Sequence, residues 1–220
     1  MKIIEIKKRR KLLSALRFDI EVNPLDYNAE SDATGLLAID SELVEIEHIK
    51  EGLELSESKL EALVLRSNIK RAKSRAMWYL SRSGCSKKTL IDKLLRAFPK
   101  EAAIAAANRM EELGYIDDEA YSRTRLPRIM EEKKVSLKLA SRMLIMEGID
   151  REIVESIAAE VEYEPCETIL NLIERKYKNK LLDEKGVKNT IAALIRKGYS
   201  YGEVKKALQM LEIESNTEEF

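Results

Sequence analysis

Three neighbouring carboxylates follow a glycine in the stretch LGYIDDEAYSR, residues 113–123. Asp117, Asp118 and Glu119 are residue types that bind divalent metals or exchange protons in an active site. Either chemistry needs a histidine, a cysteine or further carboxylates at ligand spacing, and the neighbouring sequence offers none. We therefore interpret the three acids as architectural: Gly114 ends one helix, Asp117 caps the next, and the other two lie in its first turn.

Cysteine and histidine are too few and too scattered for a catalytic or metal site. The chain has Cys85, Cys166 and a single histidine, His48, in no zinc-ligand pattern. Signatures of phosphate-binding loops and nucleophile elbows, such as GxxxxGK[ST], GxGxxG and GxSxG, are absent from the sequence. We therefore expect no cofactor, no metal and no enzymatic activity.

The composition is typical of a helical protein. Of the 220 residues, 45% are apolar and 35% are charged, whereas glycine (8) and proline (4) are scarce. No uncharged run is long enough to span a membrane, and the first residues lack the apolar stretch of a signal peptide. We expect a cytoplasmic protein without membrane contact.

A repeat of about 50 residues organises most of the chain. Equivalent residues recur at four phases: Ser86, Ser136 and Gly186; Leu94, Leu144 and Leu194; Lys100, Asp150 and Ser200; Ile104, Val154 and Val204. Apolar residues at helical spacing predict three helices per unit, which in the first unit cover residues 68–81, 87–98 and 101–113. Because a single amphipathic helix cannot bury its apolar stripe alone, each triplet should pack on its neighbour.

The predicted fold is therefore mainly α, an elongated and curved array of three tandem three-helix repeats behind a small N-terminal module. Hydrophobic alternation in the first 22 residues favours a β-hairpin, with a helix as the alternative, and the following residues up to 40 indicate loop or short strands. The expected divisions are 1–66 for the N-terminal module, 67–116, 117–162 and 163–212 for the repeats, and 213–220 for an acidic tail.

Many helices have a recognisable start, because Ser or Asp stands directly before an apolar helical pattern. Glu203 follows Ser200 by three residues and completes a capping box. Pro127 lies inside the helix that begins after Asp117, so we expect a kink or a break near Leu126. The predicted structural positions are Ser86, Gly114, Asp117, Ser136, Asp150 and Ser200.

Charge is strongly segregated although the net charge is zero. Residues 30–61 contain ten acids and two bases, a net charge of −8, and residues 66–100 contain eleven bases and one acid, a net charge of +10. Residues 123–142 are also basic. Most charges on a helix simply face solvent, but a run as basic as 66–100 favours an anionic partner. Trp78 and Tyr79 lie within this run, and helical spacing places at least one of them in a core.

Two segments, RAKSRAMWYLSRSGCSKKTLIDKLLRAF and ANRMEELGYIDDEAYSR, resemble the RecX family of bacterial recombination regulators. The similarity continues through LASRMLIMEGIDREIVESIAAE and covers roughly residues 68–211, with GYIDDEAYSR as its most specific part. It implies tandem three-helix units without catalytic residues. It also implies a partner, the RecA filament on single-stranded DNA, whose ATPase and strand-exchange activities the protein inhibits or modulates in recombination, DNA repair and the SOS response.

Two departures from the family pattern affect the first two repeats. Val135–Ser136 stands where relatives often have a glycine before the fifth helix, and Pro127 interrupts the fourth helix. Both bear on the geometry between the repeats, and therefore on the potency of a regulator that must follow a filament.

We expect a monomeric, non-enzymatic regulator whose basic residues in the first two repeats contact the filament. A direct DNA-binding, helix-turn-helix-like regulator that acts without RecA is the main alternative. A metal-dependent nuclease is a third, which the absence of clustered ligands disfavours. The candidate partner-binding or nucleic-acid-binding residues are Arg71, Arg75, Lys87, Lys88, Lys93, Arg96, Arg123, Arg125, Arg128, Lys138 and Arg142.

Overall fold

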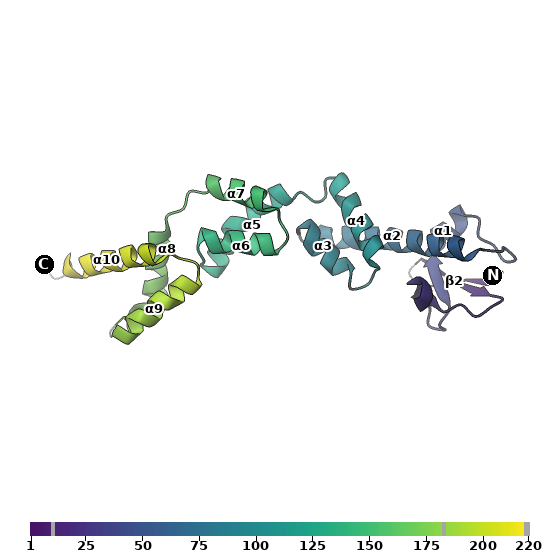
Figure 1. Ribbon diagram of the computed structural model, residues 1–220, viewed down its shortest axis with the longest axis horizontal. Coiled ribbons are helices and arrows are strands. Elements are labelled where there is room, and N and C mark those ends of the chain that lie inside the picture. The colour runs from purple at the N-terminus through teal and green to yellow at the C-terminus, as the bar shows by residue number, and fades with distance from the viewer. Residues whose placement is uncertain (10–11, 182–183, 218–220) are drawn as a thin grey trace. The chain divides into compact units, whose positions relative to one another are not determined.

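The computed structural model describes residues 1–9, 12–181 and 184–217. The protein is mainly helical and has a small antiparallel sheet at its N-terminus (Figure 1), which confirms the predicted fold class. The chain divides into two compact units, Met1–Asp117 and Asp118–Phe220.

The first unit begins with a four-stranded antiparallel sheet of order β1-β2-β4-β3. Its strands are β1 (Ile3–Lys8), β2 (Leu13–Phe18), β3 (Glu30–Ser31) and β4 (Leu37–Asp40), with a 3₁₀ turn, η1, at Pro24–Tyr27. β1 and β2 form the predicted hairpin, in which Ile6 lies opposite Leu16. The central strands β2 and β4 are almost entirely buried, as expected for short strands covered on both faces.

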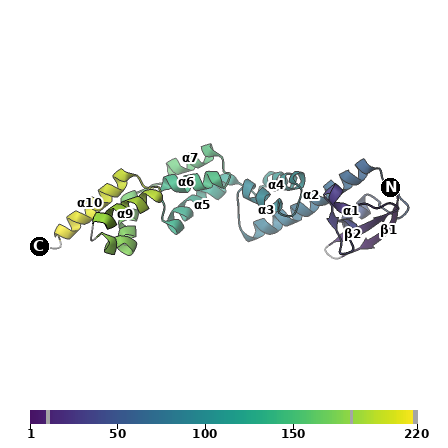
Figure 2. The same ribbon diagram turned by 60° about the horizontal axis from the view of Figure 1, so that its bottom comes forward.

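Four helices complete the first unit: α1 (Ser41–Ile46), α2 (Glu57–Arg82), α3 (Lys87–Leu94) and α4 (Lys100–Glu112). Figure 2 shows α2 running from the sheet to α3 and α4. Its N-terminal half packs on the sheet through Leu60, Leu63 and Val64. Its C-terminal half packs on α4 through Ala72 and Ala76. α2 therefore belongs to two hydrophobic cores.

The length of α2 corrects one prediction. The helix expected at residues 68–81 begins already at Glu57, directly after its N-cap Ser56. The division expected between residues 66 and 67 falls inside this helix, so the N-terminal module and the first repeat share an element. α3 ends at Leu94 rather than at residue 98.

Two polar residues interrupt the apolar pattern of α2, so the sequence alone did not predict that the helix continues through them. Ser67 and Asn68 are buried on α2. The Ser67 Oγ accepts a hydrogen bond from the Asp40 N–H at 2.8 Å, and the Asn68 Nδ2 donates to the Asn28 carbonyl at 2.9 Å. Because both side chains find partners on the sheet module, they join the core rather than break the helix.

In its described residues the second unit contains six α-helices: α5 (Asp118–Lys133), α6 (Leu137–Met146), α7 (Arg151–Glu160), α8 (Pro165–Leu172), α9 (Glu184–Arg196) and α10 (Tyr201–Thr217). A π-helical turn, η2 (Ile173–Tyr177), and a 3₁₀ turn, η3 (Lys178–Lys180), follow α8. One hydrophobic cluster lies among α5, α6 and α7, and another among α8, η2, α9 and α10.

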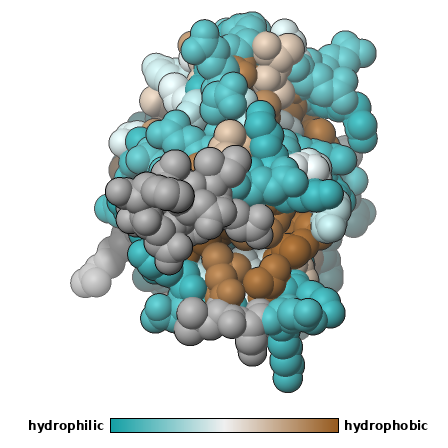
Figure 3. All heavy atoms as spheres, turned by 90° about the vertical axis from the view of Figure 1, so that its left-hand side faces the viewer, coloured by the Kyte–Doolittle hydropathy of each residue, from teal (hydrophilic) through white to brown (hydrophobic). Residues whose placement is uncertain are grey.

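The face of the second unit seen in Figure 3 is mainly hydrophilic, with hydrophobic side chains lying between hydrophilic ones. α10 extends to Thr217, so part of the predicted acidic tail continues the last helix. Residues 218–220 lie outside the described residues.

Local hydrogen bonds define the helix starts. The side chains that accept a backbone N–H bond there are Ser86 from Thr89 (3.1 Å), Ser136 from Leu139 (3.2 Å) and Asp150 from Glu152 (2.8 Å). At Ser200 the bonds are reciprocal: its N–H donates to the Glu203 carboxylate at 2.6 Å, and its Oγ accepts from the Glu203 N–H at 3.2 Å. Each such cap stabilises its helix by about 1 kcal/mol.

Pro127 does not break α5, which is helical without interruption from Asp118 to Lys133. The predicted break is therefore wrong, whereas a kink at this position stays a prediction. Proline lacks the N–H that would reach the carbonyl four residues earlier, at a cost of about 3 kcal/mol. Leu126 and Ile129, on either side of it, are fully buried, and burial of two such side chains contributes about 3 to 6 kcal/mol, enough to offset that cost.

The turn between α9 and α10 packs directly against the start of α6. The Lys197 carbonyl accepts a hydrogen bond from the Ser136 N–H at 3.0 Å, and the Lys197 Nζ donates to the Lys133 carbonyl at 2.7 Å. Gly198, with a φ of +89°, approaches so closely that a Cβ atom there would lie 2.4 Å from the Ser136 Oγ and 2.6 Å from the Leu139 Cβ. This close contact requires glycine on both conformational and steric grounds.

Both cysteines are buried, and neither forms a disulfide. Cys85 lies in the hydrophobic cluster of α2, α3 and α4, and Cys166 lies in the first turn of α8. Each unit therefore contains one protected thiol.

Asp32 organises the turn between β3 and β4. Its Oδ1 accepts hydrogen bonds from the Thr34 hydroxyl at 2.6 Å and from the Thr34 and Leu36 N–H groups, both at 2.9 Å. Its Oδ2 lies 2.9 Å from the Arg9 guanidinium. These contacts, the Thr34 hydroxyl above all, lower the pKa of Asp32 from 3.8 to about 2.

The substitution Gly198→Ala should destabilise the second unit by about 2 to 5 kcal/mol. The alanine would have to adopt a left-handed backbone conformation, and its Cβ would also overlap Ser136 and Leu139. Gly114→Ala is the matched control: its φ is +73° and nothing lies within 4 Å of its added Cβ, so only the backbone cost of about 1 to 2 kcal/mol applies. Urea unfolding followed by circular dichroism measures both values. Equal losses would contradict the close packing at Gly198.

Asp32 should make the first unit sensitive to acid. Because its pKa is lower in the folded chain, its contribution to stability is fully present above the ordinary value of 3.8 and is lost as the pH falls to about 2. Asp32→Asn should remove this part of the pH dependence. Urea titrations across that range, followed by Trp78 fluorescence, test the prediction, and an unchanged pH profile would contradict it.

Candidate partner-binding surface

The stretch LGYIDDEAYSR spans the end of α4 and the start of α5. The contacts that the structure gives for its residues are structural. Gly114 has a φ of +73°, and the Tyr115 N–H donates to the Met110 carbonyl at 2.9 Å, which closes the end of α4. α5 begins at the residue after Asp117, and Glu119 pairs with Arg123 at 2.9 Å on the helix surface. Across residues 1–9, 12–181 and 184–217, no cluster of three or more His, Cys, Asp or Glu side chains could hold a metal ion.

The basic run is partly neutralised within the first unit. Three of its residues pair with acids of the N-terminal module: Arg66 with Glu47, Lys70 with Asp40 (2.7 Å) and Glu42, and Arg71 with Glu30. The acidic and basic segments, which are separate in the sequence, therefore meet along the middle of α2. Only the later part of the run remains available to a partner.

Arg71 is accordingly a structural residue rather than a binding residue. Its guanidinium pairs with Glu30 and lies 5.6 Å from the centre of the Phe98 ring. Only 22% of its side chain is exposed. Burial, and to a smaller extent the neighbouring Arg75, lowers the pKa of Arg71, yet a guanidinium remains charged in proteins.

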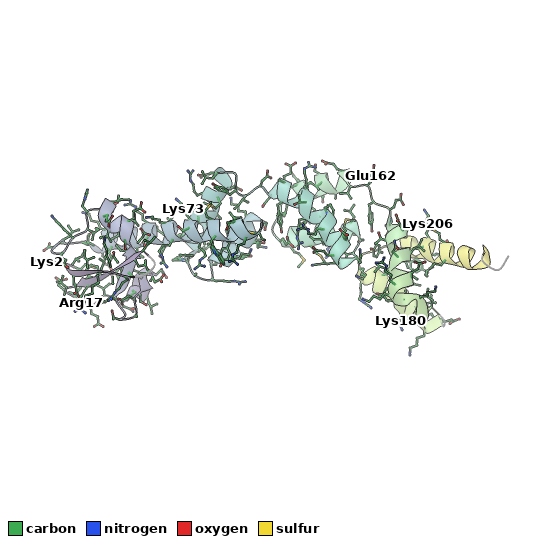
Figure 4. All side chains as sticks on the ribbon, turned by 180° about the vertical axis from the view of Figure 1, so that it is seen from behind. Lys2, Arg17, Lys73, Glu162, Lys180 and Lys206 are labelled. Atoms are coloured by element: carbon green, nitrogen blue, oxygen red, sulfur yellow. The ribbon has the colours of Figure 1, made fainter. Side chains whose placement is uncertain are left out.

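The other candidates of the first unit lie on the C-terminal half of α2 and on α3 and its end. Lys87 pairs with Glu111 at 2.6 Å, so it is also partly neutralised. Lys88 and Arg96 are exposed. The Arg75 guanidinium lies 5.5 Å from the centre of the Trp78 ring, and the Lys93 Nζ lies 5.6 Å from that of Tyr79. Figure 4 shows the side chains on the ribbon and labels Lys73, two residues before Arg75.

In the second unit the three arginines of α5 have acidic neighbours. Arg123 contacts Glu119 and Glu160, of which Glu160 is the larger cause of the raised pKa of Arg123. Arg125 lies 3.6 Å from Glu132 and 3.8 Å from Glu147, and Arg128 lies 4.0 Å from Glu132. These are exposed or long pairs, and because solvent screens them, each contributes little to stability.

Lys138 and Arg142, one helical turn apart on α6, are both exposed. They line one surface depression together with Tyr163 and Tyr199. Burial raises the pKa of Tyr163 to about 12 and also raises that of Tyr199, so both phenols are neutral at physiological pH. Glu203 lines the same depression, so the two cations share it with one carboxylate and two neutral tyrosines.

Five of the predicted residues keep an unpaired charge. Among the side chains that the structure describes, no carboxylate forms an ion pair with Arg75, Lys93, Arg96, Lys138 or Arg142, which we term the unpaired basic set. Arg75, Lys93 and Arg96 belong to the first unit, and Lys138 and Arg142 belong to the second.

One basic residue near Trp78 was missed by the sequence reasoning. Arg82 lies 4.4 Å from the centre of the Trp78 ring. The signal was present in the sequence, because residues four apart on a helix are neighbours.

Arg71 and Arg75 are four residues apart on the same helix and provide a matched test. Arg71→Ala should lower the free energy of unfolding by about 1 to 3 kcal/mol, because Glu30 loses its partner and part of the Phe98 ring is uncovered. Arg75→Ala should change it by no more than about 0.5 kcal/mol. Urea unfolding followed by Trp78 fluorescence measures both values, and equal effects would contradict the distinction between the two arginines.

In the described residues, no helix is both long enough and apolar enough to cross a membrane. No protein-family model matches the chain. Two solved structures share its fold. One, described as the crystal structure of regulatory protein RecX, has a TM-score of 0.61 and 17% identity over 93% of this chain and 98% of its own. The other, RecX from Lactobacillus salivarius, has a TM-score of 0.56 and 22% identity over 66% of this chain and 97% of its own.

Relatives in sequence carry the same name, regulatory protein RecX. The protein of Caldanaerobacter subterraneus subsp. tengcongensis is 27% identical over 188 residues, which are 84% of this chain and 92% of the relative. That of Streptococcus uberis is 26% identical over 99% of this chain and 80% of the relative. That of Thermus thermophilus is 30% identical over 105 residues, 48% of this chain and 70% of the relative. The chain therefore belongs to the RecX family of regulatory proteins.

Proposed function

We propose that this protein is a non-enzymatic regulator of recombination and DNA repair that binds the RecA filament on single-stranded DNA. It inhibits or modulates the ATPase and strand-exchange activities of that filament. Membership of the RecX family is the observation that carries the proposal. We further propose that it acts as a monomer in the cytoplasm.

The charge distribution supports an anionic partner. The filament presents nucleic acid, which attracts exposed lysines and arginines. The unpaired basic set supplies such charges in both units, and Lys88 adds an exposed lysine in the first. We assign filament contact to Arg75, Lys88, Lys93 and Arg96 in the first unit and to Lys138 and Arg142 in the second.

Five of the original candidates are less suited to this role, and two of them, Arg125 and Arg128, lie near Glu132. Arg71 is occupied by Glu30, Lys87 by Glu111, and Arg123 by Glu119 and Glu160. A partner would have to displace these acids before it could use the cations, which lowers the gain from each contact.

RecA ATPase on single-stranded DNA tests the proposal in two steps. Wild-type protein should alter the rate in a dose-dependent manner, with a fall expected. The double variant Lys138→Glu/Arg142→Glu should shift the midpoint of this effect about tenfold or more to higher concentration, since each lost charge contact weakens association.

The double variant Lys205→Glu/Lys206→Glu on α10 is the control. It makes the same change in net charge at two exposed lysines, of which Lys206 is labelled in Figure 4. Equal shifts for both variants would contradict the assignment to α6. No effect of the wild-type protein at filament-saturating concentration would contradict the proposed function itself.

Direct DNA binding without RecA is the second candidate function. The observation that favours it is Trp78, which is 44% exposed among the cations of α2 and α3.

A further inference from the structure

Trp78 is the single tryptophan of the chain, and it lies on the surface. Its neighbour Tyr79 is partly buried against the core of α2, α3 and α4, whereas Trp78 is 44% exposed. Tryptophan is among the residues most often found at the energetic centre of an interface, so its exposure points to a partner.

The indole lies inside a continuous group of cations and aromatic rings, which we term the Trp78 cluster. The guanidinium groups of Arg75 and Arg82 lie 5.5 Å and 4.4 Å from the centre of its ring. The Tyr79 ring meets it edge-on, with ring centres 5.2 Å apart and an interplanar angle of 66°. Lys93 of α3 then lies 5.6 Å from the centre of the Tyr79 ring.

No acid of the described side chains neutralises this cluster. The sequence contains no Asp or Glu between Glu61 and Asp92. The acids of the N-terminal module pair with Arg66, Lys70 and Arg71, which precede the cluster on α2. The three cations of the Trp78 cluster therefore create a positive potential around a partly exposed aromatic face.

We propose that the Trp78 cluster binds single-stranded DNA directly, with one base stacked on Trp78 and the flanking phosphates held by Arg75, Arg82 and Lys93. A base has an aromatic face that can stack on an indole, and every nucleotide brings one phosphate, so this chemistry fits the alternation of ring and cation. A duplex fits less well because its bases already stack on one another. A protein surface would have to supply carboxylates to the two arginines beside the Trp78 ring and to the lysine beside the Tyr79 ring.

This inference deepens the proposed function, since a regulator of a filament meets single-stranded DNA, but the first experiment contains no RecA. An oligothymidylate is titrated into the full-length protein, and the fluorescence of Trp78 is recorded with excitation selective for tryptophan. Because Trp78 is the only tryptophan, stacking of a base on it should quench the signal to saturation. The logarithm of the binding constant should fall with the logarithm of salt concentration with a slope of about −2, for three phosphate contacts on a single strand.

Variants are compared by the anisotropy of a labelled oligothymidylate, which does not require tryptophan. Trp78→Ala should weaken binding about 5- to 100-fold, and Trp78→Phe should retain most of the affinity because a ring remains. Arg82→Ala should weaken binding and reduce the steepness of the salt dependence by about 0.7. Arg66→Ala is the control, since it removes the same charge from the same helix at a residue already paired with Glu47. It should leave affinity nearly unchanged. Circular dichroism verifies that each variant is folded.

Three results would overturn the proposal: no binding of the oligonucleotide, binding without any change in Trp78 fluorescence, or equal losses for Trp78→Ala and Arg66→Ala. The RecA ATPase assay separates this failure from failure of the proposed function. If the wild-type protein alters the ATPase but does not bind the oligonucleotide, the filament proposal stands. If, in that case, the Trp78→Ala variant no longer alters the ATPase rate, Trp78 contacts RecA protein instead of DNA.

Discussion

The first unit depends on a single uninterrupted helix that is buried by different neighbours along its length. α2 packs on the sheet with large aliphatic side chains and on α4 with alanines, and the facing positions of α4 are also alanines with no exposed surface. Small residues on both helices allow a close approach that larger ones would prevent. The sheet, α3 and α4 are thereby attached to one rigid element. The acids of the sheet module consequently reach only the start of the basic run, from Arg66 to Arg71, and leave its later part uncovered.

Features that depend on residues close in sequence could be predicted well. Ser136 and Ser200 begin helices because a side chain bonds to an N–H three residues away, which involves no distant part of the chain. The hairpin and the mainly helical character follow in the same way from local hydrophobic patterns. The candidate site was predicted only as a set of charges. Its division into paired and unpaired residues depends on contacts such as that between Arg71 and Glu30, which are 41 positions apart in the chain.

The errors have the same physical origin. Ser67 and Asn68 interrupt the apolar pattern of α2, but distant partners on the sheet module satisfy them, and the helix continues. Pro127 weakens α5 locally, but the buried side chains beside it keep the helix in place. In both cases tertiary packing outweighs a local preference of a few kcal/mol. A partner-binding surface is harder still to read from sequence, because a charge identifies a partner only after its internal neighbours are known.

The two buried cysteines give each compact unit its own chemical reporter. A small thiol reagent can modify Cys85 or Cys166 only when the surrounding core opens, since both side chains are shielded and neither forms a disulfide. Two labelling rates measured on the unmodified chain would therefore report the opening of the two units separately. A partner that contacts only one unit would protect the thiol of that unit and leave the other thiol as reactive as before. The labelling rates of the two natural cysteines would therefore show which unit the partner contacts.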